Sequence, residues 1–156
     1  MTQTDPAQLF SVFNEIGIIE QLTRTILEAH LPEGLIAPHF TVLNHLTRVR
    51  DGQTPMDMAR AFQVPKTSLT HTLTGLEKKG LIEMRPNPDD GRSKCVWLTE
   101  AGKALRAQVI QGMAPEFVRL SQDMNLETLL GILPVLQELR IALDAARDQA
   151  PVASGI

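Results

Sequence analysis

A regularly spaced run of leucines that ends at a glycine is the feature that most restricts the fold of this chain. Leu69, Leu73 and Leu76 recur at positions i, i+4 and i+7, which places all three on one face of an α-helix. Gly80 ends the pattern, so we expect a helix over residues 66–79. Its leucine face must be covered by neighbouring elements.

The segment after this helix has the composition of a β-hairpin. Residues 81–85 and 94–98 are short runs of side chains that favour strands. The stretch 86–93 between them is rich in Pro, Asn, Asp and Gly, which is typical of a turn. We therefore expect two short strands joined by a polar loop, with Arg92 at the projecting tip.

Further helices flank this unit on both sides. Asp5, followed by a proline, is typical of a helix start. Gly112 and Pro115 are expected to bend or break the helix that begins at Thr99, and Pro134 is expected to kink the last helix. The last six residues are expected to fray. The predicted helices cover residues 5–31, 38–50, 54–62, 66–79, a segment from 99 onward, and 125–149.

This order of elements is that of a winged helix-turn-helix. Short helices, a tight turn, a further helix and a hairpin follow one another between residues 38 and 98. We predict a mainly α fold with a small β-hairpin wing, formed by a single domain over residues 1–156. In this domain the helices within 5–31 and 99–149 lie outside the winged core.

The terminal helices carry more apolar surface than one chain of this size can cover. Apolar side chains occupy nearly every angle around the last predicted helix, and the first helix is similarly broad. We expect both to bind a second copy of the chain about a two-fold axis, giving a homodimer. A monomeric layer of helices is the alternative. In the last helix the residues are Leu126, Leu129, Leu130, Ile132, Leu133, Val135, Leu136, Leu139, Ile141 and Leu143.

Charge is unevenly distributed along the chain. The whole chain has a formal charge of −3, but residues 65–106 hold eight Lys or Arg and five Asp or Glu, a net +3. The remainder is therefore net −6. A basic segment between acidic ends indicates a partner that is a polyanion, and a nucleic-acid backbone is the usual one.

The face of the leucine-lined helix opposite its leucines has the chemistry to contact a DNA duplex. Thr67, His71, Thr74 and Lys78 lie on it at positions i, i+4, i+7 and i+11. Threonine can hydrogen-bond a base edge or touch a thymine methyl group, and lysine can reach guanine or phosphate. Lys66 adds a positive charge beside the free N–H groups at the helix start. An ordinary solvated helix face is the alternative.

Arg92 in the expected loop of the hairpin suggests a second contact. An arginine on a projecting ribbon can enter a narrow minor groove, where negative potential is concentrated. Asp90, two residues earlier, is placed to orient the guanidinium by a charge-assisted hydrogen bond. A solvated arginine on a capped turn is the alternative for the hairpin taken alone.

The run from residue 62 to residue 102 resembles the DNA-binding core of the MarR (multiple antibiotic resistance regulator) family. Four motifs carry the resemblance in order: Val-Pro-Lys-Thr at the helix start, Leu-Glu-Lys-Lys-Gly-Leu-Ile at its end, an Asp-x-Arg wing and a Leu-Thr-x-x-Gly segment. The resemblance implies a dimeric, sequence-specific DNA-binding transcription regulator of a pseudo-palindromic duplex operator. It also implies a repressor that a small aromatic or amphipathic effector relieves.

The resemblance assigns roles to individual residues. The recognition helix is 66–79, and the wing arginine and its supporting aspartate are Arg92 and Asp90. Two departures matter: His71 stands where many members carry arginine, and Gly75 inside the helix costs about 1 kcal/mol relative to alanine. The groove-facing positions fall on Thr67, Ser68, Thr70, His71 and Thr74, and we expect phosphate contacts from Lys66, Lys78, Lys79, Arg85 and Lys94.

Other functional classes have weaker support. Asp89, Asp90 and Ser93 lack a base, an orienting group and a water-excluding pocket, so we expect no enzyme. The histidines lack paired ligand spacing, so we expect no metal, and we expect no bound cofactor. Cys95 is expected to be an inert thiol that is packed or partly exposed. A winged helix that binds proteins without binding DNA is the main alternative function.

Two further expectations concern location and effector. The sequence contains no apolar run of the roughly 18 residues that a membrane span needs and no secretory signal pattern, so we expect no membrane partner and a cytoplasmic protein. An effector between the dimer helices and the winged core is expected near Phe13, His30, His39 and His45.

Overall fold

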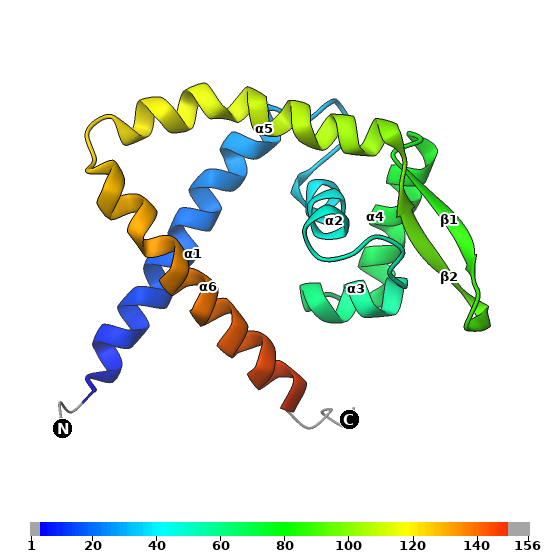
Figure 1. The fold of residues 1–156 in the computed structure, drawn as a ribbon, viewed down its shortest axis with the longest axis horizontal. Coiled ribbons are helices and arrows are strands. Elements are labelled where there is room, and N and C mark those ends of the chain that lie inside the picture. Colours follow the sequence, from blue (N-terminus) through cyan, green and yellow to red (C-terminus); the bar gives the residue numbers. More distant parts are fainter. Residues whose placement is uncertain (1–3, 150–156) are drawn as a thin grey trace. The chain divides into compact units, whose positions relative to one another are not determined.

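The computed structural model describes residues 4–149. Its contacts divide the chain into two compact units that meet between Met113 and Ala114, and each unit is described by itself. The expected fraying of the last six residues lies outside the described range. The elements are α1 (Pro6–Ala29), α2 (Ala37–Arg48), α3 (Pro55–Phe62), α4 (Lys66–Lys78), β1 (Ile82–Asn87), β2 (Asp90–Leu98), α5 (Glu100–Ser121) and α6 (Leu126–Gln149), drawn in Figure 1.

Side-chain caps explain where several helices begin. Asp5 Oδ1 accepts a hydrogen bond of 2.9 Å from the backbone N–H of Ala7 at the start of α1. Thr54 Oγ1 accepts one of 3.2 Å from the N–H of Asp57 in α3, and Asn125 caps α6 in the same way. Each such cap stabilises its helix by about 1 kcal/mol. The helix starts predicted at these residues are confirmed.

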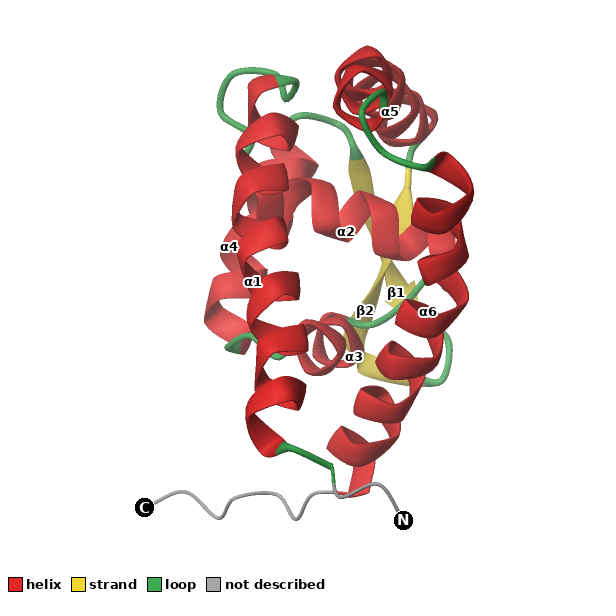
Figure 2. Ribbon diagram, turned by 90° about the vertical axis from the view of Figure 1, so that its left-hand side faces the viewer, coloured by secondary structure: helices red, strands yellow, loops and turns green. Residues whose placement is uncertain are grey.

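The core of the first unit lies among α2, α3, α4 and the hairpin (Figure 2). The predicted inward face of α4 is confirmed, because Leu69, Leu73 and Leu76 are 2%, 4% and 0% exposed. Full burial of one leucine stabilises a fold by about 1.5–3 kcal/mol. The other buried members of this core are Leu35, Val42, Leu43, Leu46, Met58, Ala59, Leu81, Ile82, Val96 and Leu98.

The hairpin is longer than predicted. β1 and β2 pair antiparallel from Ile82 opposite Leu98 to Asn87 opposite Asp90, and only residues 88 and 89 form the turn. The expectation of a loop over 86–93 is therefore wrong. Pro86 is tolerated within the ladder because each strand of a two-stranded sheet has a free edge, where no N–H is needed.

Of the two outcomes expected at Gly112 and Pro115, a bend or a break in α5, the break is wrong. The helix runs from Glu100 to Ser121 without interruption through Gly112 and Pro115, and α6 is likewise continuous through Pro134. Pro115 leaves the carbonyl of the residue one turn earlier without its usual donor. That residue, Gln111, is exposed, so water can satisfy its carbonyl.

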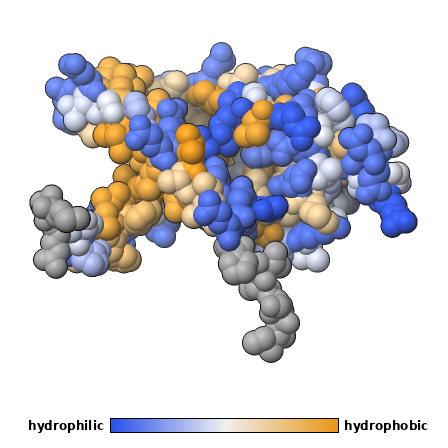
Figure 3. All heavy atoms as spheres, turned by 60° about the horizontal axis from the view of Figure 1, so that its bottom comes forward, coloured by the Kyte–Doolittle hydropathy of each residue, from blue (hydrophilic) through white to orange (hydrophobic). Residues whose placement is uncertain are grey.

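The terminal helices bury none of their described residues within this one chain. Leu22 in α1 is 65% exposed and Leu130 in α6 is 60% exposed. Figure 3 shows apolar side chains gathered on the surface of the terminal helices. None of the described helices combines the length and the apolar character that crossing a bilayer requires.

Candidate nucleic-acid interface

The outward face of α4 is polar and uncovered. All five residues predicted to face a groove are exposed: Thr67, Ser68, Thr70, His71 and Thr74. The helix starts at a proline N-cap with no side-chain hydrogen bond to its first turn. The N–H groups of that turn therefore lack a capping partner among the described residues, and they can bind a phosphate.

Two threonines on this face hydrogen-bond back to their own helix. Thr70 Oγ1 donates to the carbonyl of Lys66 and Thr74 Oγ1 donates to the carbonyl of Thr70, each at 2.9 Å. Because each hydroxyl proton is already engaged, what the side chain offers outward is an oxygen lone pair and a methyl group. Thr70 and Thr74 are thus acceptors and apolar contacts on this face, a detail that spacing alone did not predict.

Uncompensated cations surround this face. Lys66 and Lys78 lie at the two ends of α4, and Arg92 and Lys94 lie on β2. All four side chains belong to exposed residues. None of the four forms an ion pair with another described residue. Their charges are free to interact with an external anion.

Arg92 lies in a bulge of the wing instead of at its turn. The strand register jumps from Asn87 opposite Asp90 to Pro86 opposite Lys94, which leaves residues 91–93 of β2 without partners in the ladder. A bulge of this kind redirects side chains away from the regular alternation of a strand. The predicted position of Arg92 at the tip is corrected to a position just beyond it.

Asp90 supports Arg92 through the backbone. Its Oδ1 accepts a hydrogen bond of 2.9 Å from the N–H of Arg92, and Asn87 Nδ2 donates to Ser93 Oγ at 2.9 Å across the same bulge. The predicted bond from Asp90 to the guanidinium is not formed among the described residues. Asp90 therefore fixes the bulge, and the guanidinium extends from it without a carboxylate partner.

Arg85 is already engaged within the wing. Its guanidinium pairs with Glu83 and lies 4.8 Å above the ring centroid of Trp97. A phosphate contact would have to compete with the neighbouring carboxylate, so we expect Arg85 to contribute less than the unpaired lysines. The sequence pattern did not predict this pairing.

The base of the wing is locked to the loop before α3. Asp51 Oδ1 accepts hydrogen bonds of 3.0 Å from the N–H groups of Gly52 and Leu98. Gln53 and Val96 form a bridge in which Val96 N–H donates to the Gln53 carbonyl at 2.8 Å. Gly52 has a φ of +74°, and a Cβ there would meet the Trp97 ring at 2.5 Å. Only glycine suits this position, so the hairpin is held at a fixed place.

Gly75 in the recognition helix has a packing reason. A Cβ at this position would lie 2.9 Å from Nε2 of His39 on α2. The imidazole is anchored, because its Nδ1 accepts a hydrogen bond of 3.0 Å from the N–H of Ile36. Burial lowers the pKa of His39 below its ordinary value; the hydrogen bond with Ile36 raises it in part, and the neighbouring His71 and Lys79 lower it further. The pair sets how closely α4 approaches α2.

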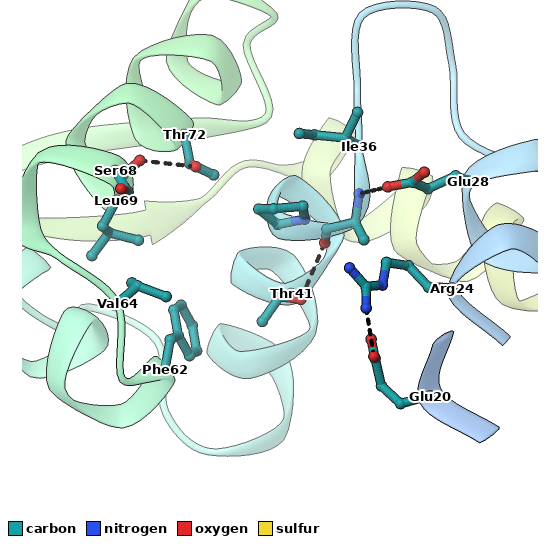
Figure 4. A pocket seen from close by; sticks show the side chains of 12 residues that line it. Glu20, Arg24, Glu28, Ile36, Thr41, Phe62, Val64, Ser68, Leu69 and Thr72 are labelled. Carbon is teal, nitrogen blue, oxygen red and sulfur yellow. Dashed lines mark hydrogen bonds and ion pairs between the residues drawn. The ribbon is translucent and has the colours of Figure 1, made fainter. Parts of the chain in front are cut away.

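A cavity of about 510 Å³ lies behind α4 (Figure 4). None of Phe13, His30, His39 and His45, the residues expected near an effector, lines it; His45, for example, is buried against Gln53 at 3.1 Å. The lining comes from α1, the residue before α2 and the first turns of α2, the end of α3, the loop before α4, and α4 itself. It consists of Glu20, Arg24, Glu28, Ile36, Ala37, Pro38, Thr41, Phe62, Val64, Ser68, Leu69 and Thr72.

The remaining candidate groups are buried or hydrogen-bonded within the wing. Cys95 is buried, as expected for a packed thiol. Asp89 and Asp90 both use their backbone or side chain within the turn of the wing. Over residues 4–149, no three His, Cys, Asp or Glu side chains lie in an arrangement that could hold a metal ion.

Comparison with known proteins gives one family. A family model described as the MarR family matches residues 33–93. Apo wild-type MarR from E. coli has 24% identity and a TM-score of 0.69, covering 89% of this chain and 98% of that one. A mutant of E. coli MarR complexed with operator DNA has 24% identity and a TM-score of 0.67, covering 87% and 99%. BldR from Sulfolobus solfataricus has 19% identity and a TM-score of 0.69, also covering 87% and 99%. Likeness at these identities establishes the predicted winged helix-turn-helix fold.

Proposed function

Because this chain belongs to the MarR family, we propose that it is a transcription regulator that binds duplex DNA as a homodimer. The observation that carries the proposal is the exposed face of α4, with Thr67, His71 and Thr74 outward and unpaired cations around it. The whole chain is acidic, but the cations around this face have no carboxylate partners, so the face can bind a polyanion.

In this proposal α4 enters the major groove and the wing reaches the adjacent minor groove. Outward lone pairs of Thr70 and Thr74 can accept from base amino groups, and their methyl groups can contact thymine. Arg92 enters the minor groove, and Lys66, Lys78 and Lys94 contact phosphates. Lys79 at the end of the helix extends this contact surface, and the exposed Ser68 lies at its edge, where α4 also borders the cavity behind it.

We also propose which parts of the chain bind DNA and which parts form the dimer. Residues 38–98 form the DNA-binding core, and the helices within 5–31 and 99–149 form the dimer. A two-fold axis would present two copies of α4 to half-sites about one helical turn, or roughly 10 base pairs, apart. The broad apolar surfaces of α1 and α6 support this assignment.

Regulation is the finer part of the proposal. When this protein occupies an operator, other proteins cannot use that DNA, so we propose that it is a repressor. We propose that it acts in the compartment that holds the DNA. The cavity behind α4 has the size of a small-molecule site. An effector bound there touches α4 through Leu69, and it can therefore change the position of the recognition helix.

The test is duplex binding by the purified chain. Genomic fragments selected on the protein would give a duplex, whose affinity is then measured by fluorescence anisotropy at several salt concentrations. Contacts to about six phosphates predict a slope of log K against log salt of about −5. A winged helix that serves only protein partners would show neither selection nor salt-dependent binding, and that result would reject the proposal.

Arg92→Ala gives the matching residue test. Because Arg92 is exposed and unpaired, its loss should leave the midpoint of thermal unfolding unchanged. Operator affinity should fall about tenfold, within the range typical of one specific contact. Lys103→Ala, which removes a cation paired with Glu100 on α5, is the control. Unchanged affinity in Arg92→Ala would exclude the wing from the contact.

A further inference from the structure

We infer that the cavity behind α4 binds an amphipathic organic cation, an apolar body with one amine, in preference to an organic anion of the same shape. The binding site itself stands on the geometry of the cavity. Only its consequence for DNA binding rests on the function proposed above.

The apolar side of the cavity fits the body of such a molecule. Phe62 at the end of α3, Val64 in the loop before α4 and Leu69 on α4 form this side, and Ile36 before α2 adds an apolar side chain near Glu28 (Figure 4). Ile36 is 52% exposed and Val64 is 38% exposed. An apolar ligand that covers these exposed side chains removes them from water, and this burial favours binding.

The opposite side of the cavity is charged, and its three ionic groups are arranged along α1. Arg24 Nη2 lies 2.6 Å from Glu20 Oε2, so the only cation of the lining is paired with a carboxylate. Glu28 Oε1 accepts a hydrogen bond of 2.9 Å from the N–H of Ala37 at the start of α2. Its negative charge remains, and no cationic side chain within the described residues pairs with it.

This arrangement decides the charge of the occupant. An organic anion would have to displace Glu20 from Arg24 and would be repelled by Glu28. An organic cation meets two carboxylates and one guanidinium, a net charge of −1. Complementarity of charge therefore favours an amine over a carboxylate with the same apolar body.

The same cavity reaches the back of the recognition helix. Ser68 and Thr72 line it from α4, while Glu28 ties the end of α1 to the start of α2. A bound amine that draws Glu28 toward itself competes with the N–H of Ala37. The expected consequence is a change in how α1 supports the winged core, and through it a change in operator affinity.

Three probes of one shape test the inference: 4-phenylbutylamine, 4-phenylbutanol and 4-phenylbutyrate. Each is titrated by calorimetry into the full chain without DNA at neutral pH and low salt. We expect the amine to bind about five- to tenfold more tightly than the carboxylate, with the alcohol between them, as one partly exposed charge allows. Equal or tighter binding of the carboxylate would overturn the inference.

Variants locate the effect. Glu28→Gln keeps an oxygen for the Ala37 N–H but removes the charge, so the preference for the amine should shrink; Glu100→Gln, 92% exposed on α5, is the matched control. Val64→Trp fills the apolar side and should weaken all three probes, with circular dichroism checking the fold. The site is rejected if the amine still binds to Val64→Trp, or if none of the three probes binds the chain at millimolar concentration. Duplex binding that persists in that case leaves the proposed function standing.

Discussion

Helices α4 and α6 are both rich in leucine, but the two helices differ in whether those leucines are buried. In α4 every leucine of the inward face is at most 4% exposed, although the helix has only 13 residues. In α6, which has 24 residues and more leucines, no described residue is buried. Leu126, Leu130 and Leu133 in α6 are all more than 50% exposed.

The difference shows which part of the molecule is complete within one chain. The leucines of α4 are covered by α2, α3 and the hairpin, so the winged core holds its shape by its own contacts. An apolar helix exposed to water needs a covering surface. In the proposed dimer a second copy of the chain supplies that surface.

The largest expected effect comes from a charge on α6. Leu133→Glu places a carboxylate on the apolar surface proposed for the dimer, where burial of an unpaired charge is costly. We expect monomers in sedimentation velocity and a loss of about a hundredfold in operator affinity, because paired half-site binding is lost. Gln137→Glu, which adds the same charge at an exposed polar position, should leave the dimer intact. A dimer that persists in Leu133→Glu would contradict the assignment of α6.

Paired leucine truncations sharpen the contrast between the two helices. Leu76→Ala opens a space in the winged core and should lower the free energy of unfolding by about 3 kcal/mol. Leu130→Ala should act through association, so its effect on urea unfolding should depend on protein concentration. If Leu76→Ala also depended on concentration, or Leu130→Ala did not, the division between a complete and an incomplete region would fail.

Gly75→Ala tests the contact between α2 and α4. Alanine improves helix propensity by about 1 kcal/mol, but its Cβ would meet Nε2 of the anchored His39. We expect a net loss of about 1 kcal/mol in urea unfolding. The double variant His39→Ala/Gly75→Ala removes the clash, and a double-mutant cycle should show recovery. Additive losses in the cycle would exclude the contact.

Acid should weaken the same contact, and this is the smallest effect of the four. Burial, with the charges of His71 and Lys79, lowers the pKa of His39 in the folded chain below the ordinary 6.5. The unfolded chain therefore binds more protons in this range, so the stability contributed by neutral His39 is lost as pH falls below about 6.5. The free energy of unfolding, measured in urea between pH 7 and pH 5, should depend less steeply on pH in His39→Asn than in the unchanged chain. An unchanged slope would remove His39 from the pH dependence.

Local patterns in the sequence predicted most of the fold. The spacing of Leu69, Leu73 and Leu76 identified the buried face of α4, and the predicted starts of the first and last helices coincide with the caps at Asp5 and Asn125. The errors concern proline. Pro86 lies in a strand at a free edge, and Pro115 lies in a helix at an exposed turn; in both places solvent access removes the usual penalty.

Contacts between distant segments account for what the sequence did not predict about the site. His39 and Gly75 meet only because α2 packs on α4, and the cavity exists only where α1, α2 and α4 converge. Asp90 was predicted to be a partner of Arg92, but the bulge directs its carboxylate to the backbone N–H instead of the guanidinium. A one-dimensional pattern cannot distinguish these partners, since both belong to the same residue.

The number of chains bound to one DNA duplex distinguishes a dimeric DNA-binding regulator from a monomer. Sedimentation velocity on the purified chain, alone and with a selected duplex of about 20–25 base pairs, counts the chains in each species. We expect a dimer without DNA and two chains on one duplex with it, which dissociate from the duplex together as the salt concentration rises. A monomer at micromolar concentration, or a chain that leaves the duplex unbound in dilute buffer, would contradict this expectation.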